Sequence, residues 1–476
     1  MRRESWLQRI LLILAAVGLA TGLADPGLAQ TDRDERQTQL QQDTETSVRI
    51  VCGGFVQDFG SPDNPALTPQ QSDLFRRCRE MVHSSNDLDG REPDAFSLDL
   101  TEEELNGAYQ NLAGEEAINP GTMSTEIQDV QLANIARRLA AVRRGASGFS
   151  VVDLGFATDS GVLQASRLGL GPSTEQPRGG AASADSAGPE RWGVFINGIF
   201  GFGDKDGTDN EDGFEFDTAG VTAGADIRLD NNVVLGGALG YGSMETTFDD
   251  TATGTVTGGG VDADGLGAAL YLTKWWEKLY LDGVISYGQN GYDFERSIRY
   301  PTVNRTATAD TDGDLWSATL GFGYDVAKGG WTYGPYLRAS AFQLDIDGYT
   351  EHGAGGLELE VDKQEVESLL SMLGLQVAYA ASKSWGVLLP QGRIGWNHEF
   401  QNDSRVIIAR YLNDPSSALH PLVAFTDEPD RDFFPVSLAL VFALRGGTQL
   451  FINYDTLIDL DDITNHTFTL GGRFAL

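Results

Sequence analysis

Apolar and polar residues alternate along most of the chain from Trp192 to Leu476. From residue 316 to residue 326 every even position is apolar, while the odd positions between them are Gly, Ser, Thr or Asp. Period-two alternation places apolar side chains on one face of a strand. The other face, rich in small and charged residues, is a poor lining for a dry core. The pattern is typical of a membrane β-barrel with lipid outside and water or a plug inside.

The alternation predicts twelve strands, near 191–203, 213–229, 233–248, 261–273, 278–294, 313–327, 331–347, 364–380, 386–400, 432–445, 448–457 and 466–476. Their connections are alternately short and long, as in outer-membrane barrels with short periplasmic turns and long extracellular loops. The predicted fold is therefore a twelve-stranded antiparallel up-and-down outer-membrane barrel over 191–476, with both barrel ends on the periplasmic side. The apolar stretch 405–411 is interpreted as loop structure, because a thirteenth strand would break the alternation.

Tryptophans support this topology independently. The ends predicted to be periplasmic carry Trp192, Trp275, Trp276, Trp331 and Trp385. An aromatic girdle at the membrane interface places tryptophan there. The alternative, a soluble sandwich with tryptophan in its core, gives no reason for the residues to gather at one end.

The first 29 residues resemble a secretory signal. Arg2, Arg3 and Arg9 are followed by the apolar stretch Ile10–Ala20 and a small-residue cleavage site ending at Ala29. A retained membrane anchor is the alternative, but the apolar stretch is shorter than the roughly 20 residues that a span needs. We expect an exported protein.

Residues 30–122 are interpreted as a short, mainly helical passenger module. Its first part, Gln30–Ser47, lacks an apolar period and predicts a flexible lead. A helix is predicted over Pro69–His83, where Thr68 and Gln71 form a capping box, and a second helix runs from Thr101 to about Ala113.

Residues 123–145 contain a predicted amphipathic helix, about Thr125–Arg144. An apolar stripe runs along it, and arginines crowd its C-terminal half, where cations complement the helix dipole. The stretch 146–190, rich in Gly, Ala and Ser, predicts a flexible linker. The net charge of −35 disfavours nucleic acid as a partner, since phosphate binding needs clustered Lys and Arg.

The barrel region resembles the translocator domain of autotransporters, the proteins of type V secretion. The similarity is clearest over 335–353, 368–379, 385–400 and 451–476. It implies a helix inside the barrel, here Gln131–Gly145, that links the barrel to an N-terminal passenger. It also implies that the outer membrane surrounds the barrel and that the passenger is at the cell surface. Some members cut themselves at paired asparagines in that helix, whereas Ala133 precedes Asn134 here.

Charges on the helix and on the barrel wall predict an electrostatic fit. The helix carries Arg137, Arg138, Arg143 and Arg144. The polar strand faces carry Asp226, Asp282, Asp325, Arg338, Arg393, Asp455 and Arg473. Charge pairs away from bulk water interact more strongly than surface pairs. The alternative is a helix that only packs against the passenger.

Cys52 and Cys78 are the two cysteines of the chain. A disulfide is the expected state of two cysteines in an exported protein. In the chain-entropy model a loop of this size stabilises a small module by about 3.5 kcal/mol. A catalytic thiol is the alternative, but no histidine in a suitable context accompanies either residue.

Other candidate chemistry is weaker. The acidic stretches Asp204–Asp209 and Asp310–Asp314 suggest calcium, but Gly is not at the position that an EF-hand loop needs. The neighbours His398 and Glu399 could form an enzymatic pair near the extracellular rim. No hydrolase triad can be assembled in the passenger. We therefore predict a protein that is not an enzyme and has no cofactor or metal.

The sequence predicts a monomeric autotransporter that presents its passenger at the cell surface, for example for adhesion to an unidentified surface ligand. Its expected partners are outer-membrane lipid, the barrel-assembly machinery and periplasmic chaperones. Two alternatives stay open: a barrel protease or lipase with a site at the extracellular rim, and a passive porin. A porin would leave the arginine-rich helix unexplained.

Overall fold

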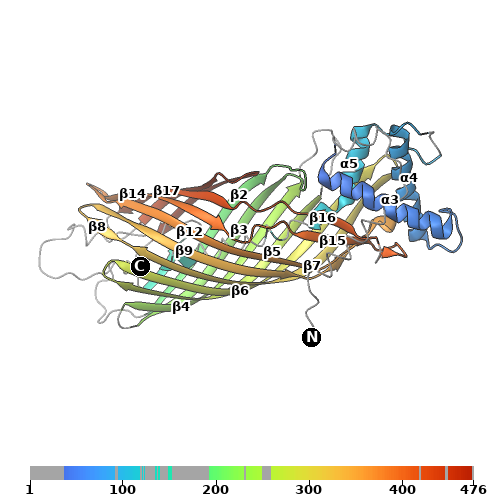
Figure 1. Ribbon diagram of the computed structural model, residues 1–476. Coiled ribbons are helices and arrows are strands. Elements are labelled where there is room, and N and C mark those ends of the chain that lie inside the picture. Colours follow the sequence, from blue (N-terminus) through green and yellow to red (C-terminus); the bar gives the residue numbers. More distant parts are fainter. Residues whose placement is uncertain are drawn as a thin grey trace, which may run out of the picture.

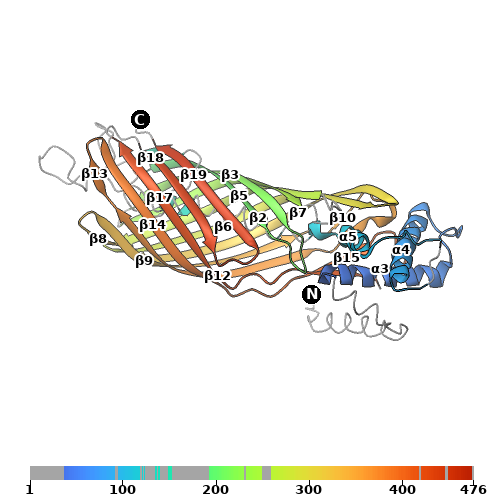
Figure 2. The same ribbon diagram turned by 90° about the horizontal axis from the view of Figure 1, so that it is seen from above.

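The computed structural model describes residues 37–91, 95–117, 121, 123, 135, 136, 138, 139, 148–152, 192–229, 232–248, 259–417, 420–444 and 449–473. The predicted signal (1–29) and most of the predicted linker lie outside these residues. The described part forms a barrel that carries a group of helices at one end (Figures 1 and 2). We call this the cap end, and the opposite end, where the connections are short, the turn end.

Twelve antiparallel strands form the barrel wall, as predicted. They are β2 (Trp192–Lys205), β3 (Phe214–Leu229), β4 (Val233–Phe248), β5 (Gly259–Trp276), β6 (Leu279–Tyr300), β7 (Val303–Tyr324), β9 (Trp331–Ile346), β12 (Gln364–Tyr379), β14 (Gly386–Glu399), β17 (Asp432–Leu444), β18 (Gln449–Ile458) and β19 (Ile463–Arg473). Each pairs with the next in this order, and β19 returns to β2.

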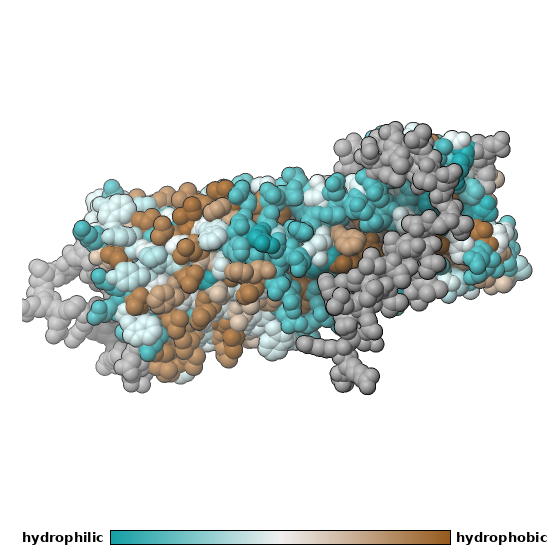
Figure 3. Space-filling view, in the orientation of Figure 1, coloured by the Kyte–Doolittle hydropathy of each residue, from teal (hydrophilic) through white to brown (hydrophobic). Residues whose placement is uncertain are grey.

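The side chains along the strands are alternately buried and exposed, as the apolar and polar alternation predicts. Along β5 the odd positions are buried from Val261 to Thr273, while Leu266 and Leu270 on the other face are 67% and 60% exposed. On the face seen in Figure 3, apolar side chains gather over the half of the barrel away from the cap. Such a belt suits a lipid environment rather than water.

The closing seam has an additional strand. β2 and β19 pair along Gly203–Lys205 and Ile463–Asn465, near the cap end. At the turn end a short strand, β1 (Gly148–Val152), pairs in parallel with residues 193–197 of β2. The prediction of an unstructured linker from residue 146 onward is therefore wrong at its start.

Two predictions about loops are also corrected. The stretch 295–312, expected to be a long connection, extends β6 and β7 to a turn at residues 301 and 302. The stretch 405–411, expected to be a loop, contains strand β15 (Val406–Tyr411). β15 lies outside the barrel, in a small sheet with β10 (Tyr349–Thr350), β11 (Leu359–Val361) and β16 (Leu422–Phe425), so the barrel keeps an even strand number.

We call residues 37–117 the cap. It contains α3 (Gln39–Phe59), α4 (Pro69–Leu88), α5 (Glu102–Ala113) and the short 3-10 helix η1 (Glu115–Ala117). The helix at Pro69, with its capping box, and the helix that follows Thr101 were predicted. The flexible lead predicted over Gln30–Ser47 is wrong from Gln39 onward. Among the described helices none is long and apolar enough to cross a membrane.

The missed helix has a sequence signal. Thr38 accepts a hydrogen bond from the backbone N–H of Gln41, and the Gln41 side chain accepts one from the backbone of Thr38. This is the same capping box as at Thr68. It was hidden because α3 begins among polar residues: after Leu40, the next buried apolar positions, such as Val51 and Phe55, follow more than two turns later.

The cap and the barrel share one hydrophobic core. Cap residues such as Phe55, Leu74 and Tyr109 are buried in the same cluster as inward-facing strand residues such as Phe294 and Leu344. Stacked rings of Phe55 and Phe75, 5.1 Å apart, join α3 to α4. The inner face of the barrel is therefore apolar at the cap end, in contrast to the polar lumen that the sequence predicted for the whole length.

Candidate functional site

The cap is fastened to the barrel by a buried cation. Arg296 of β6 donates to both carboxylate oxygens of Glu351, one at 2.8 Å, and to the carbonyl oxygens of Asn111 and Leu357 at 3.1 and 3.0 Å. The side chains of Arg296 and Glu351 are 3% and 8% exposed. Asn111 belongs to α5 of the cap, so this one guanidinium joins the cap, β6 and the segment after β10.

A second contact lies closer to solvent. Arg305 of β7 donates to both carboxylate oxygens of Asp73 in α4, one at 3.0 Å, and the backbone N–H of Gly356 donates to Asp73 at 2.9 Å. Although burial alone would raise it, these hydrogen bonds hold the pKa of Asp73 below its usual value. Thr302, in the turn between β6 and β7, donates to Glu80 at 2.8 Å. The β6–β7 hairpin, predicted as a loop, is thus the support of the cap.

Glu116 of η1 adds a titratable group to this interface. Burial raises the pKa of Glu116 to about 8, although Arg296 opposes the shift, and Glu351 and Asp212 add to it. The carboxyl group is therefore protonated in the folded protein at pH 7, where an exposed glutamate is charged.

Stability of the cap should fall as the pH rises. The folded pKa of Glu116 lies above the unfolded value of 4.5, so its contribution is complete below pH 4.5 and is lost as the pH rises through about 8. We expect the melting temperature of the cap to decrease between pH 5 and 8.5, measured by calorimetry. Glu116→Gln should flatten this dependence. An equal pH slope in the variant would contradict the role of Glu116.

In the lumen, one arginine of the predicted helix and one carboxylate of the predicted wall form a buried charge pair. Arg138 donates to both carboxylate oxygens of Asp226 in β3, at 2.5 and 3.0 Å, and the two side chains are 2% and 6% exposed. Tyr271 donates to the same carboxylate at 3.0 Å. A Cβ on Gly193 would lie 2.0 Å from Nη2 of Arg138, so only glycine lets the guanidinium reach Asp226.

Apolar contacts hold the same segment against the wall. Ile135 and Leu139 are helical and fully buried, in a cluster with Phe195, Tyr271 and Val284. Ile135 and Leu139 of the predicted lumen helix thus contact the barrel wall, whereas Met123, at the start of the segment 123–145, is buried in the core shared by the cap and the barrel. Asn134, Arg137, Arg143 and Arg144 lie outside the described residues.

The other predicted wall residues are spread around the barrel. Asp282 accepts from Thr273 at 2.6 Å, Asp325 accepts from Gln376 at 2.7 Å, and Asp455 accepts from Asn453. Arg393 lies over the Tyr336 ring, 5.5 Å from its centroid, and Arg338 is half-buried in β9. The backbone of Arg473 pairs with Gln449, and its side chain lies outside the description.

The cysteines face each other across the helix pair. Cys52 lies on α3 and Cys78 lies on α4, and both are buried thiols in the structure. Burial, together with a hydrogen bond to Cys52, raises the pKa of the Cys78 thiol well above its usual value. A protonated, buried thiol is a poor nucleophile.

We predict that export oxidises this pair to a disulfide. Mass spectrometry of unreduced protein from the outer membrane should find the peptides of Cys52 and Cys78 linked. The bridge should stabilise the cap by about 3.5 kcal/mol against Cys52→Ser. Two alkylated thiols in protein prepared without reductant would refute the prediction.

The two acidic stretches take different places in the structure. In the first, the Lys205 ammonium lies 2.9 Å from Asp427 and 3.1 Å from Glu211, so nearby carboxylates are paired with a side-chain cation. Asp310 and Asp314 lie in strand β7. In the part of the chain that the structure describes, no group of three His, Cys, Asp or Glu residues could hold a metal ion.

Two histidine–carboxylate pairs lie at the cap end. His398 bonds Asp432 at 2.8 Å, but its neighbour Glu399 turns to the other face and accepts from Ser368 at 2.5 Å, so the predicted pair is split. His420 bonds Asp414 at 2.7 Å, with side chains 14% and 3% exposed, against Gly54 of α3. The second pair was missed because residues 401–431 gave no regular pattern.

The comparisons with curated proteins give partial relatives. The chain is 26% identical to "Esterase EstA" of Pseudomonas aeruginosa over 182 residues. These residues make up 37% of this chain and 27% of the relative. It is also 27% identical to "Extracellular serine protease" of Serratia marcescens over 275 residues. These residues make up 56% of this chain and 24% of the relative. The chain thus spans about a quarter of the length of these relatives. Their names contradict the expectation that the chain is not an enzyme.

Among solved structures, the translocator domain of autotransporter NalP from Neisseria meningitidis is similar. It is 14% identical, with a TM-score of 0.46, over 60% of this chain and 89% of that one.

The family comparison covers most of the barrel. The family described as "Autotransporter beta-domain" matches residues 194–455, which run from the third residue of β2 into β18 and make up more than half of the chain. The chain belongs to the autotransporter beta-domain family.

Proposed function

We propose that this autotransporter keeps its exported passenger as a fixed cap over the outer mouth of its own barrel. The barrel lies in the outer membrane, and the passenger is at the cell surface in this family. With the cap as the passenger, the cap end is the cell-surface end. The observation that carries the proposal is the shared core of α3, α4 and α5 with the inner faces of the barrel strands. A passenger that is released would need a hydrophobic core of its own, without side chains contributed by the barrel strands.

Polar contacts support permanent attachment. Besides Arg296 and Arg305, Gln110 of α5 donates to Asp212 at 2.9 Å, and Gln364 of β12 donates to the carbonyl of Ala117 at 2.8 Å. Separating the cap would leave these buried groups without partners and would expose the core to water. The cap therefore presents one fixed surface to its surroundings. Its surface ligand is the partner to seek, and insertion is expected to use the barrel-assembly machinery and periplasmic chaperones.

Surface labelling tests the proposal. An epitope inserted after the exposed Ala66, between α3 and α4, should be labelled on intact cells, and the labelled chain should have the full mature length in the outer-membrane fraction. A labelled fragment in the medium would contradict attachment. Labelling only after cell lysis would contradict surface display.

Hydrolysis at the cap end is the second candidate, favoured by the Asp414–His420 pair. A carboxylate on one ring nitrogen orients a histidine as a general base. Among the described residues no hydroxyl or thiol is hydrogen bonded to the other ring nitrogen, so this candidate ranks second. Full-length protein should be assayed on short-chain esters. Hydrolysis that His420→Gln abolishes would favour this candidate, and no hydrolysis by the wild type would remove it.

A further inference from the structure

The turn end of this acidic protein carries most of its lysines. The net charge is −35, yet four of the six lysines, Lys274, Lys278, Lys328 and Lys383, lie in or beside the short turns. These turns join β5 to β6, β7 to β9, and β12 to β14, which follow one another around the barrel. We call these four residues the lysine arc. A concentrated positive arc on a negative protein indicates a specific anionic partner.

Aromatic residues accompany the arc. The Lys274 ammonium lies 4.9 Å from the Trp276 ring centroid, and the Lys278 ammonium lies 6.0 Å from that of Tyr324. Trp331 pairs with Lys328 in the neighbouring hairpin. On a membrane barrel, exposed tryptophan and tyrosine residues at the strand ends mark the level of the lipid headgroups.

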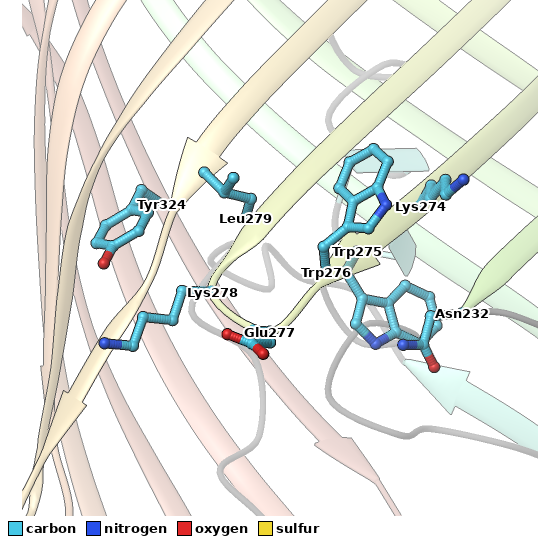
Figure 4. Close-up of a pocket in the computed structure, with 8 residues that line it drawn as sticks. All are labelled: Asn232, Lys274, Trp275, Trp276, Glu277, Lys278, Leu279 and Tyr324. Carbon is cyan, nitrogen blue, oxygen red and sulfur yellow. The ribbon is translucent and has the colours of Figure 1, made fainter.

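The two lysines of the β5–β6 turn line a groove. It has a volume of about 700 Å³, and its walls include Trp276, Leu279 and Tyr324. Figure 4 shows Lys278 and Tyr324 on one side of the turn and Lys274 with the two tryptophans on the other. Lys274 and Trp276 follow Leu270 and Leu272 on the exposed face of β5, so this part of the groove opens toward lipid.

Such a groove suits a phospholipid better than a soluble anion. The ammonium groups can bind a phosphate, while Leu279 and the ring of Trp276 offer apolar surface to the glycerol and the first carbons of the chains. A lysine at the edge of an apolar belt extends its ammonium to the headgroup level, where the phosphates are. A soluble anion would use only the charges and would leave the apolar walls without contacts.

We propose that the lysine arc binds anionic phospholipids of the periplasmic leaflet, with the Lys274–Lys278 groove as its principal site. The arc then fixes the depth and the orientation of the barrel in the membrane. Each lysine near a phosphate favours an anionic lipid by roughly fivefold, and two lysines together by roughly 25-fold. The carboxylate of Glu277, which lies between them in the turn, opposes this preference, so we predict about tenfold for phosphatidylglycerol over phosphatidylethanolamine.

Native mass spectrometry of the full-length protein tests this preference. The protein is released from micelles that contain equal amounts of phosphatidylglycerol and phosphatidylethanolamine, and the ratio of the two lipid adducts is measured. The wild type should retain the anionic lipid. In Lys274→Gln with Lys278→Gln the ratio should fall about tenfold, whereas Lys274→Arg with Lys278→Arg should keep it. Lys363→Gln, a 69% exposed lysine at the cap end, is the matched control.

Three results would overturn the proposal. One is an unchanged ratio in the glutamine variant, and another is an equal fall in the Lys363→Gln control. The third is displacement of the lipid by millimolar inorganic phosphate, which would indicate a site for a soluble phosphate. Heat modifiability on gels verifies that each variant is folded. If Lys274→Gln with Lys278→Gln is not heat-modifiable, the variant Lys328→Gln with Lys383→Gln is measured instead. It should lower the ratio of the lipid adducts severalfold, and an unchanged ratio in this second variant would also overturn the proposal.

Discussion

Replacing Arg296 with Met should loosen the cap by about 3 to 5 kcal/mol, the usual cost of removing one partner from a buried ion pair. Glu351 would stay buried without its cation, and the carbonyls of Asn111 and Leu357 would lose a donor. Proteolysis of the cap through its open state should therefore accelerate by two to three orders of magnitude. The rate is measured with proteinase K on folded protein in micelles.

Two variants control this experiment. Arg305→Met removes a cation whose pair with Asp73 is 27% and 21% exposed, so its cost should be about 1 kcal/mol. Arg296→Met with Glu351→Leu removes both buried charges and should recover part of the loss. If the single Arg296 variant is digested no faster than the Arg305 variant, the buried pair does not hold the cap.

Replacing Arg138 with Met should release the lumen segment at a similar cost of about 3 to 5 kcal/mol, because Asp226 would remain buried without a cation. The pore should then conduct more in planar bilayers, and the melting temperature of the barrel should fall. Gly193→Val should act in the same direction, since its side chain would occupy the path of the guanidinium.

A double-mutant cycle separates the ion pair from general damage. Arg138→Met combined with Asp226→Asn should destabilise the barrel less than the two single variants together. Arg410→Met, whose pair with Asp362 lies at the small sheet outside the barrel, serves as the arginine control and should leave the conductance unchanged. Unaltered conductance in the Arg138 variant would show that the segment does not close the lumen.

The barrel could be predicted because its signal is local. Period-two alternation and the alternating lengths of the connections gave the strand number and the placement of Trp276 and Trp331 at one end. Arg138 and Asp226 could be selected by charge and strand face, although the sequence did not distinguish Asp226 from Asp282 as the partner.

The cap interface could not be predicted because it depends on long-range packing. The alternation through Arg296, Ile298 and Tyr300 continues the strand pattern, but an apolar inner face there makes sense only with the cap helices above it. The rule that long connections are loops therefore hid the β6–β7 extension. Glu351 gave no signal, since its partner is 55 residues away in the chain.

Strand β1 was hidden for a related reason. Gly148–Val152 is short, and it pairs in parallel with a strand that begins 40 residues later. Composition around it indicated a linker, and a parallel pairing over such a separation leaves no local pattern.

The fixed position of the cap is the central claim, and a distance distribution tests it most directly. Spin labels at Val56 of α3 and at Leu320 of β7, both exposed, should be introduced into full-length protein in nanodiscs, where the buried Cys52 and Cys78 do not react. Pulsed electron paramagnetic resonance should give one narrow distribution, as narrow as that of the barrel pair Leu239 and Leu320. A broad distance distribution between Val56 and Leu320, together with a narrow one between Leu239 and Leu320, would contradict a fixed cap.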